Sequence, residues 1–167
     1  MNKEKSRRKA ASLRGKLLLE LLSREDFQRL CFQRSKGLCV LCSGTAVDAH
    51  HIFDRKLFPD GGYRLNNAAA LCSACHWRAE TCAEAVPAIL AASAISEPLI
   101  PPHAAALGLA SAADCSRLDK WGNMIRADGS VAPGPLFHDD GCRKALADGG
   151  RLALCYEAGD FPWSEAG

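Results

Sequence analysis

Apolar residues recur at helical spacing in the first part of the chain, which predicts amphipathic helices there. The first such run is Leu17, Leu18, Leu21 and Leu22. A second helix is predicted over residues 24–35, because Ser23 can cap its first turn and acidic residues follow at once. Phe27 and Cys31 would lie on its apolar face, Cys31 as a packing residue, and Gly37 would end it.

The pattern changes after residue 46. Residues 47–53 predict a strand, whose period of two places His50 and Ile52 on one face and His51 on the other. A polar loop rich in proline and glycine follows over 54–67 and is expected to line a cleft. A short apolar segment over 67–71 then leads into a helix that starts at Cys72 and carries His76 and Glu80 on one face.

The second half of the chain has weaker signals. A helix is predicted over 88–95, with Pro87 in its first turn, and prolines between 98 and 102 mark a break. A small hairpin is expected over 124–131 and a weak helix over 139–147. No function is assigned to the segment 119–123 that precedes the hairpin. We therefore expect a small α+β protein with three parts: residues 1–36, a core over 37–81, and an extension of unknown role over 82–167.

Composition narrows the class of protein. The chain has 167 residues, 48% of them hydrophobic, and its longest apolar runs are alanine-rich and interrupted by proline. These runs are too short for a membrane span, and no membrane role is expected. Nine cysteines in a chain without a hydrophobic signal segment favour an intracellular, cytoplasmic protein that binds metal over a secreted, disulfide-bonded one.

Charge is distributed unevenly, although the net charge is only +2. Residues 1–36 hold eleven lysines and arginines against four acidic residues, whereas the remainder holds ten against fifteen. A basic segment of this kind suits contact with a phosphate backbone, for which Arg7 and Arg8 are candidates. A solvated tail without a partner is an equally good interpretation of such a run.

Two C-x-x-C pairs carry the strongest chemical signal. Cys39 and Cys42 stand about thirty residues before Cys72 and Cys75, which is the spacing of a structural zinc site with four thiolates. Other zinc proteins fit less well: no H-x₃₋₅-H follows as in a classical finger, and a deaminase needs H-x-E and P-C-x-x-C. The remaining cysteines have no ligand spacing.

The order C-x-x-C, H-H-I, G-G, N, L-C-x-x-C-H over residues 37–81 resembles the HNH nuclease motif, which is housed in a ββα-metal fold. The resemblance implies that His50 and His76 bind a catalytic metal and that His51 is the general base. It also implies that Asn67 orients the base and its loop. Glu80 matches a position where some members carry a further ligand, although a plain surface glutamate is as good an interpretation.

What the resemblance implies about activity is specific. The protein would hydrolyse phosphodiester bonds of DNA, most plausibly double-stranded, in a bacterial or phage-like context, with one Mg²⁺, Mn²⁺, Ni²⁺ or Zn²⁺ beside the structural zinc. Arg55, Lys56 and Arg64 would contact phosphates. The alternative is a zinc module without catalysis that binds nucleic acid or protein. The alanines at 68–70 depart from the bulkier residues usual there, which weakens the predicted packing of the second strand. Protein partners cannot be deduced.

Overall fold

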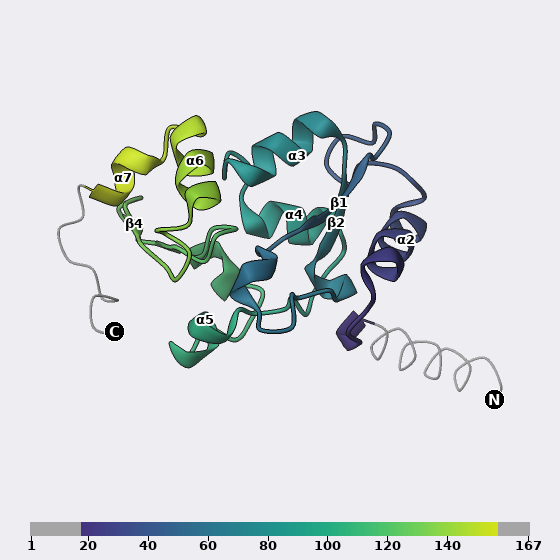
Figure 1. Ribbon diagram of the computed structural model, residues 1–167, viewed down its shortest axis with the longest axis horizontal. Coiled ribbons are helices and arrows are strands. Elements are labelled where there is room, and N and C mark those ends of the chain that lie inside the picture. Colours follow the sequence, from purple (N-terminus) through teal and green to yellow (C-terminus); the bar gives the residue numbers. More distant parts are fainter. Residues whose placement is uncertain (1–17, 157–167) are drawn as a thin grey trace.

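The computed structural model describes residues 18–156 of the chain (Figure 1), so Arg7, Arg8 and the part of the first predicted helix before Leu18 lie outside the described residues. The prediction that this helix continues through Leu21 and Leu22 is wrong, because only Leu18 and Leu19 are helical and residues 20–23 are irregular. It is a small mixed α+β structure with two antiparallel two-stranded sheets. Its helices are α2 (Arg24–Ser35), α3 (Ser73–Glu80), α4 (Val86–Ala92), α5 (Pro102–Ala106), α6 (Asp140–Asp148) and α7 (Leu152–Tyr156). Its strands are β1 (Asp48–His51), β2 (Ala68–Leu71), β3 (Met124–Ile125) and β4 (Val131–Ala132).

Helix α2 has the bounds that its sequence predicts. The Ser23 side chain accepts a hydrogen bond from the Asp26 backbone N–H at 3.1 Å, which satisfies one of the free donors of the first turn. At the other end Lys36 and Gly37 both adopt positive φ, at 57° and 73°, and the Gly37 N–H donates to the Phe32 carbonyl. Phe27 and Cys31 are buried, so the prediction for Cys31 as a packing residue is confirmed.

Strands β1 and β2 form a hairpin with helices on both faces. His51 pairs with Ala68, and His50 pairs with Ala69, so each pair projects to its own side of the hairpin. Ala68 packs in a cluster with residues of α2, and Ala69 packs in the main core. All four residues of β2 are buried, because a small side chain leaves room for a helix on either face. The expected weak packing of this strand is therefore not what the structure shows.

The predicted strand around His50 was too long, and the predicted loop contains regular turns. Strand β1 covers only Asp48–His51, shorter than the predicted 47–53. The loop over 54–67 contains two 3₁₀ turns, Arg55–Leu57 and Leu65–Asn67. Gly62 is required in this loop, since its φ is +62° and a Cβ there would lie 2.5 Å from the Phe58 ring.

The predictions for the second half were correct in kind. Helix α4 begins before residue 88 with Pro87 in its first turn, and β3 pairs with β4 in the expected hairpin. Helix α6 lies where the weak helix was predicted, and Asp139 caps it by accepting from the backbone N–H of Gly141 and of Cys142. The short helices α5 and α7 were not predicted.

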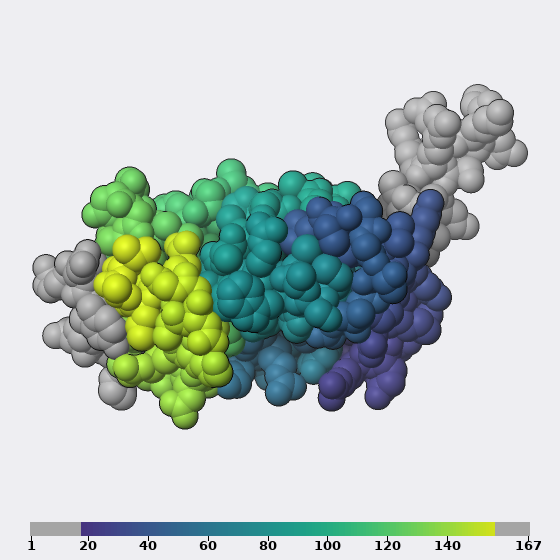
Figure 2. All heavy atoms as spheres, turned by 90° about the horizontal axis from the view of Figure 1, so that it is seen from above, coloured from purple at the N-terminus to yellow at the C-terminus, as the bar shows by residue number. Residues whose placement is uncertain are grey.

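The hydrophobic core does not end at residue 81. A first cluster joins the hairpin and α3 to α4 and to later residues, among them Ile52, Leu71, Ile89, Leu90 and Leu118. A second cluster under β4, α6 and α7 contains Cys82, Trp121, Val131, Phe137 and Leu146. Figure 2 shows the yellow and green carboxy-terminal elements forming one body with the teal middle of the chain.

Across the described range 18–156, the structure contains no helix of the length and apolar character that a membrane crossing requires.

Candidate functional site

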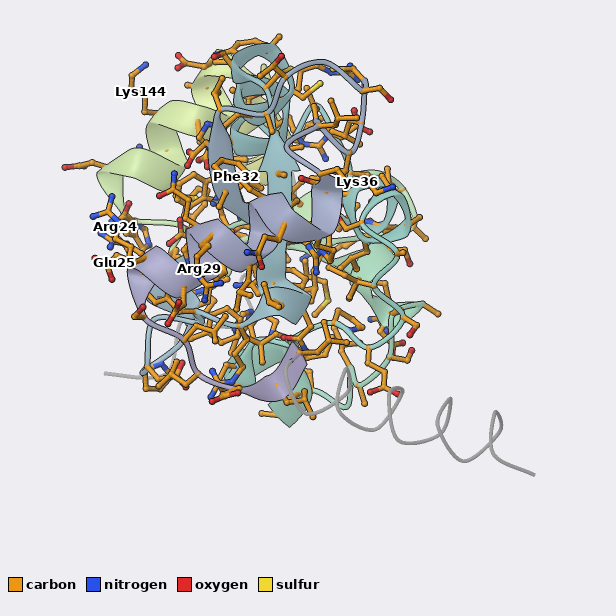
Figure 3. The ribbon with its side chains drawn as sticks, turned by 90° about the vertical axis from the view of Figure 1, so that its right-hand side faces the viewer. Arg24, Glu25, Arg29, Phe32, Lys36 and Lys144 are labelled. Atoms are coloured by element: carbon orange, nitrogen blue, oxygen red, sulfur yellow. The ribbon has the colours of Figure 1, made fainter. Side chains whose placement is uncertain are left out.

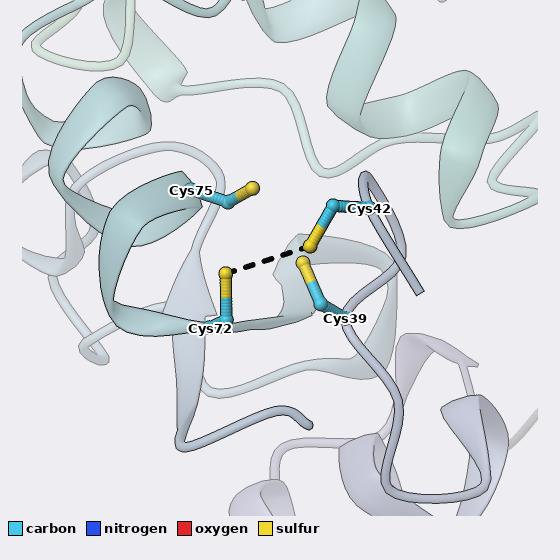
Figure 4. A group of neighbouring side chains, drawn as sticks. All are labelled: Cys39, Cys42, Cys72 and Cys75. Atoms are coloured by element: carbon cyan, nitrogen blue, oxygen red, sulfur yellow. Dashed lines mark hydrogen bonds between the residues drawn. The ribbon is translucent and has the colours of Figure 1, made fainter. Parts of the chain in front are cut away.

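The four paired cysteines converge on one point (Figure 4). Their sulfur atoms all lie within 4.8 Å of one another, and the Sγ atoms of Cys42 and Cys72 are 3.6 Å apart. Four thiolates at about 2.3 Å from a tetrahedral zinc would stand about 3.8 Å apart, so the cluster has the dimensions of such a site. None of the nine cysteines is in a disulfide. This group could hold a metal ion, and a site closed by four protein ligands is structural in character.

Local backbone geometry positions these thiols. Cys39 starts a tight turn in which its N–H donates to the Gly44 carbonyl at 2.7 Å, and Cys72 occupies the N-cap position of α3. Burial and then the neighbouring cysteines raise the pKa of Cys75 to about 12. Burial opposes ionisation of Cys39 as well, but backbone hydrogen bonds from Cys72, Cys42 and Leu41 lower its pKa to about 7. Four thiols this close need a cation to ionise together, which fits the residues to a bound metal.

A second cluster of ligand atoms joins β1 to α3. His50 comes from β1, and His76 and Glu80 stand one turn apart on α3. Glu80 Oε1 is 3.3 Å from His50 Nδ1 and 3.3 Å from His76 Nε2, and the two imidazole rings meet edge to face at 5.0 Å. The three ligand atoms lie within 4.8 Å of one another. Glu80 is thus grouped with the two histidines, and the three side chains could hold a metal ion.

The electrostatics of this cluster suit a cation. Burial lowers the pKa of His50 to about 4, so its ring is neutral at neutral pH. Neither ring nitrogen of His50 has a hydrogen-bond partner among the described residues, and the charged Glu80 Oε1 atom lies 3.3 Å from His50 Nδ1. Burial opposes ionisation of Glu80, but His50, His76 and Lys120 hold its pKa far below the usual value. Neutral imidazole and ionised carboxylate are the ligand forms that a divalent metal requires.

Asp48 adds an outer partner to this cluster. Its Oδ2 lies 3.5 Å from His76 Nδ1, on the ring nitrogen that does not face Glu80. Carboxylates in this position commonly orient a ligating imidazole.

His51 lies on the face of β1 opposite to His50, as the alternation of side chains along a strand predicts. Its ring stacks on Phe27 at 4.5 Å between centroids, and the ring of Tyr63 stands nearly perpendicular to it at 4.8 Å. The Nε2 atom is buried and has no hydrogen-bond partner in the part of the chain that the structure describes. Burial, and then the positive charge of Lys120, lower the pKa of His51 to about 4. The imidazole is therefore neutral at neutral pH and held in one orientation.

One cavity of about 270 Å³ brings His51 and the second cluster together. Its lining includes His51 and all three residues of the second cluster, His50, His76 and Glu80. The same cavity is lined by charged side chains from distant parts of the sequence, namely Arg24, Asp48, Asp54, Arg55 and Lys120. The cavity thus combines two neutral imidazoles, His50 and His51, with a group that could hold a metal ion and with cations that can attract an anionic group.

Asn67 acts on the backbone near His51. Its Oδ1 accepts from the Phe53 N–H at 2.8 Å, and its Nδ2 donates to the carbonyls of Phe53 at 3.0 Å and Gly62 at 3.3 Å. The side chain is fully buried. Asn67 thus joins the chain two residues beyond His51 to the turn at Gly62.

The cations predicted to contact phosphates differ in their placement. Arg55 lines the cavity, with its Nη1 atom 3.5 Å from the Tyr63 hydroxyl. Lys56 is paired with Asp139 at 2.6 Å, and Arg64 is paired with Asp60 at 2.7 Å. Neither Lys56 nor Arg64 lines the cavity.

Sequence reasoning missed Lys120, Asp54 and Arg24 as cavity residues. Arg24 could have been proposed, because it opens a predicted helix in the basic segment. No sequence signal pointed to Lys120, which is forty residues beyond Glu80.

Comparison with protein-family models, with curated proteins and with solved structures found no match for this chain. Function is therefore argued from the residues of the site.

Proposed function

We propose that this protein is a metal-dependent endonuclease of the HNH type that hydrolyses phosphodiester bonds in DNA. The observation that carries the proposal is the neutral His51 imidazole, whose unpaired Nε2 shares one cavity with the His50, His76 and Glu80 cluster. The order of elements, a hairpin of β1 and β2 followed by α3, is the order of the ββα-metal fold. A zinc ribbon without catalysis would have no need of this second cluster.

In this mechanism His51 removes a proton from the attacking water. Because burial keeps the ring unprotonated, it is in the form that a general base needs at neutral pH. Phe27 and Tyr63 fix the plane of the ring, and Asn67 fixes the backbone that follows it. Orientation of this kind lowers the entropic cost of reaching the transition state.

His50, His76 and Glu80 would hold one divalent ion, Mg²⁺, Mn²⁺, Ni²⁺ or Zn²⁺. When bound, the ion supplies charge neutralisation at the scissile phosphate and at the departing oxygen. Asp48 orients the His76 ring from its outer side. Cys39, Cys42, Cys72 and Cys75 would hold a structural zinc, which fastens the turn at residue 39 to the start of α3.

Double-stranded DNA is the proposed substrate, and cations of the cavity wall would contact its phosphate backbone. Arg24 and Arg55 line it directly. Figure 3 shows Arg24 and Arg29 on the exposed side of α2, although Arg29 is paired with Asp26 at 2.6 Å. The basic residues of the amino-terminal segment, Arg7 and Arg8 among them, extend this charge in the sequence. Contacts of this type bind the phosphate backbone without regard to sequence.

Cleavage of supercoiled plasmid by the purified full-length chain tests the proposal. The reactions contain EDTA or one of Mg²⁺, Mn²⁺, Ni²⁺ and Zn²⁺, with His51→Ala beside the parent protein. Loss of the base should lower the cleavage rate by about 10²-fold or more. His138→Ala is the matched control, because His138 is exposed and outside the cavity, and it should cleave like the parent.

Zinc content and circular dichroism of both variants should match the parent. Metal-dependent nicking that His51→Ala retains in full would remove His51 as the base. If the parent protein holds one zinc tightly but fails to cleave plasmid with any of the added metals, it is instead the non-catalytic binding module.

A further inference from the structure

Lys120 brings a buried positive charge into the wall of the His51 cavity. Its side chain is only 4% exposed, yet it lines the cavity together with the two histidines of β1 and with Glu80. It belongs to the carboxy-terminal part of the chain, which neither the cysteine pairs nor the histidine motif includes. Burying an ammonium group costs several kcal/mol unless close partners compensate, so its position calls for an explanation.

The backbone around Lys120 is built as a rigid turn. Asp119 Oδ1 accepts from the N–H groups of Trp121 at 2.9 Å and Asn123 at 3.0 Å, and Asp119 Oδ2 accepts from Asn123 Nδ2. Gly122 completes the turn with φ of +77°. The turn is fastened to the site on both sides of the lysine: the Lys120 carbonyl accepts from the Asp54 N–H at 2.9 Å, and Trp121 Nε1 donates to the Glu80 carbonyl at 3.0 Å.

The ammonium group has two carboxylate partners. Lys120 Nζ is 3.2 Å from Asp54 Oδ2 and 3.3 Å from Glu80 Oε1, and it lies 4.8 Å from the centroid of the Trp121 ring. An ammonium group has three N–H donors, so two carboxylate partners do not use all of them.

The charges of the cavity favour an anionic ligand there. Three carboxylates line it, and Lys120 together with one divalent ion held there would balance their charge. With that ion bound, the guanidinium groups of Arg24 and Arg55 would remain as positive charge around the same space. A phosphodiester that enters the cavity would neutralise part of this positive charge.

We propose that Lys120 binds a non-bridging oxygen of the scissile phosphate, and that the carboxy-terminal half of the chain thereby completes the active site. The inference rests on the proposed endonuclease function. The competing explanation is that Lys120 only holds Glu80 and Asp54 in place. The two explanations differ in what happens to metal binding when the charge is removed.

The test compares Lys120→Met with Lys144→Met in the full-length chain. Lys144 lies in the same half of the protein, its side chain is 75% exposed, and its partner Asp148 is outside the cavity, so it is a matched control. With Mn²⁺, Lys120→Met should cleave plasmid about 10²-fold more slowly, as for loss of one donor to a transition state, and Lys144→Met should cleave normally. Binding of a short DNA duplex in Ca²⁺, measured by fluorescence anisotropy, should weaken about tenfold for Lys120→Met alone.

Metal affinity separates the explanations. Calorimetric titration with Mn²⁺ should show unchanged or tighter binding to Lys120→Met, because a positive charge beside Glu80 has been removed. If Mn²⁺ binds more weakly and excess Mn²⁺ restores the full cleavage rate, Lys120 is a positioning residue for Glu80 and the inference fails. It fails equally if Lys120→Met cleaves plasmid and binds duplex like the parent.

A folding defect is controlled with Asp54→Asn combined with Lys120→Met. This pair leaves no unpaired Asp54 carboxylate and keeps the Oδ1 atom that accepts from the Lys56 N–H. The double variant should fold, and should show the same losses of cleavage and duplex binding. If the parent chain fails to cleave plasmid with any metal, the proposed function is overturned. The duplex-binding comparison would then decide by itself whether Lys120 binds phosphate.

Discussion

Replacing Asn67 by alanine should destabilise the fold more than the same change at its neighbour Asn66. Both side chains are buried, and both are asparagines in the same 3₁₀ turn. They differ in their partners. Asn67 makes three hydrogen bonds, two to the backbone of Phe53 and one to Gly62, whereas Asn66 donates one hydrogen bond to the Glu97 carbonyl.

The expected difference follows from the groups left behind. Asn67→Ala leaves the buried N–H and carbonyl of Phe53 without their partner, at about 1–3 kcal/mol for each group, or about 2–6 kcal/mol in total. A domain of this size has about 5–15 kcal/mol of stability, so the loss is a large share of it. Asn66→Ala removes one hydrogen bond, and it also removes a buried Oδ1 that has no partner among the described residues. Its cost should be about 1 kcal/mol or less.

Urea denaturation of both variants at fixed zinc concentration measures this difference. An Asn67→Ala loss below about 1 kcal/mol, or equal losses for the two variants, would show that Asn67 does not hold the chain beyond His51. Cleavage measured at a temperature where the variant stays folded gives the second readout. Because Asn67 acts through the backbone, its replacement should lower the rate less than His51→Ala does.

Two further changes test the parts of the protein that hold the site. Cys42→Ser should abolish tight zinc binding and lower the melting temperature, because a hydroxyl is a poor zinc ligand. The control Cys115→Ala should keep one zinc per chain, as measured by elemental analysis. Zinc retention by the serine variant would show that Cys42 is not a ligand. Gly149→Ala should cost about 1–3 kcal/mol in urea denaturation, because its Cβ would lie 2.2 Å from the Thr81 carbonyl oxygen and must push α6 from the end of α3. Gly150→Ala meets no atom within 4 Å and should cost only about 1 kcal/mol for its φ of +68°, so equal losses would mean that the contact with Thr81 is unimportant.

Several local features could be predicted because short-range chemistry decides them. Ser23 caps α2, and the turn at Lys36 and Gly37 ends it, through contacts within a few residues. The period of two in β1 separates His50 from His51 for the same reason. Sequence reasoning failed where an outcome depended on distant partners. The alanines of β2 predicted weak packing, but all four residues of this strand are buried because helices cover both faces of the hairpin.

The sequence by itself determined the candidate ligand types and their spacing: two cysteine pairs, adjacent histidines, and a histidine and glutamate one helical turn apart. These follow from covalent order and from helix and strand geometry, which hold in any fold. Only the tertiary structure decided that Arg24, Arg55 and Lys120 share one cavity with His51. It also decided that Lys56 and Arg64 are paired with acidic residues instead. Packing of the two cores brings residue 120 beside residue 80, and no local pattern in the chain encodes that approach.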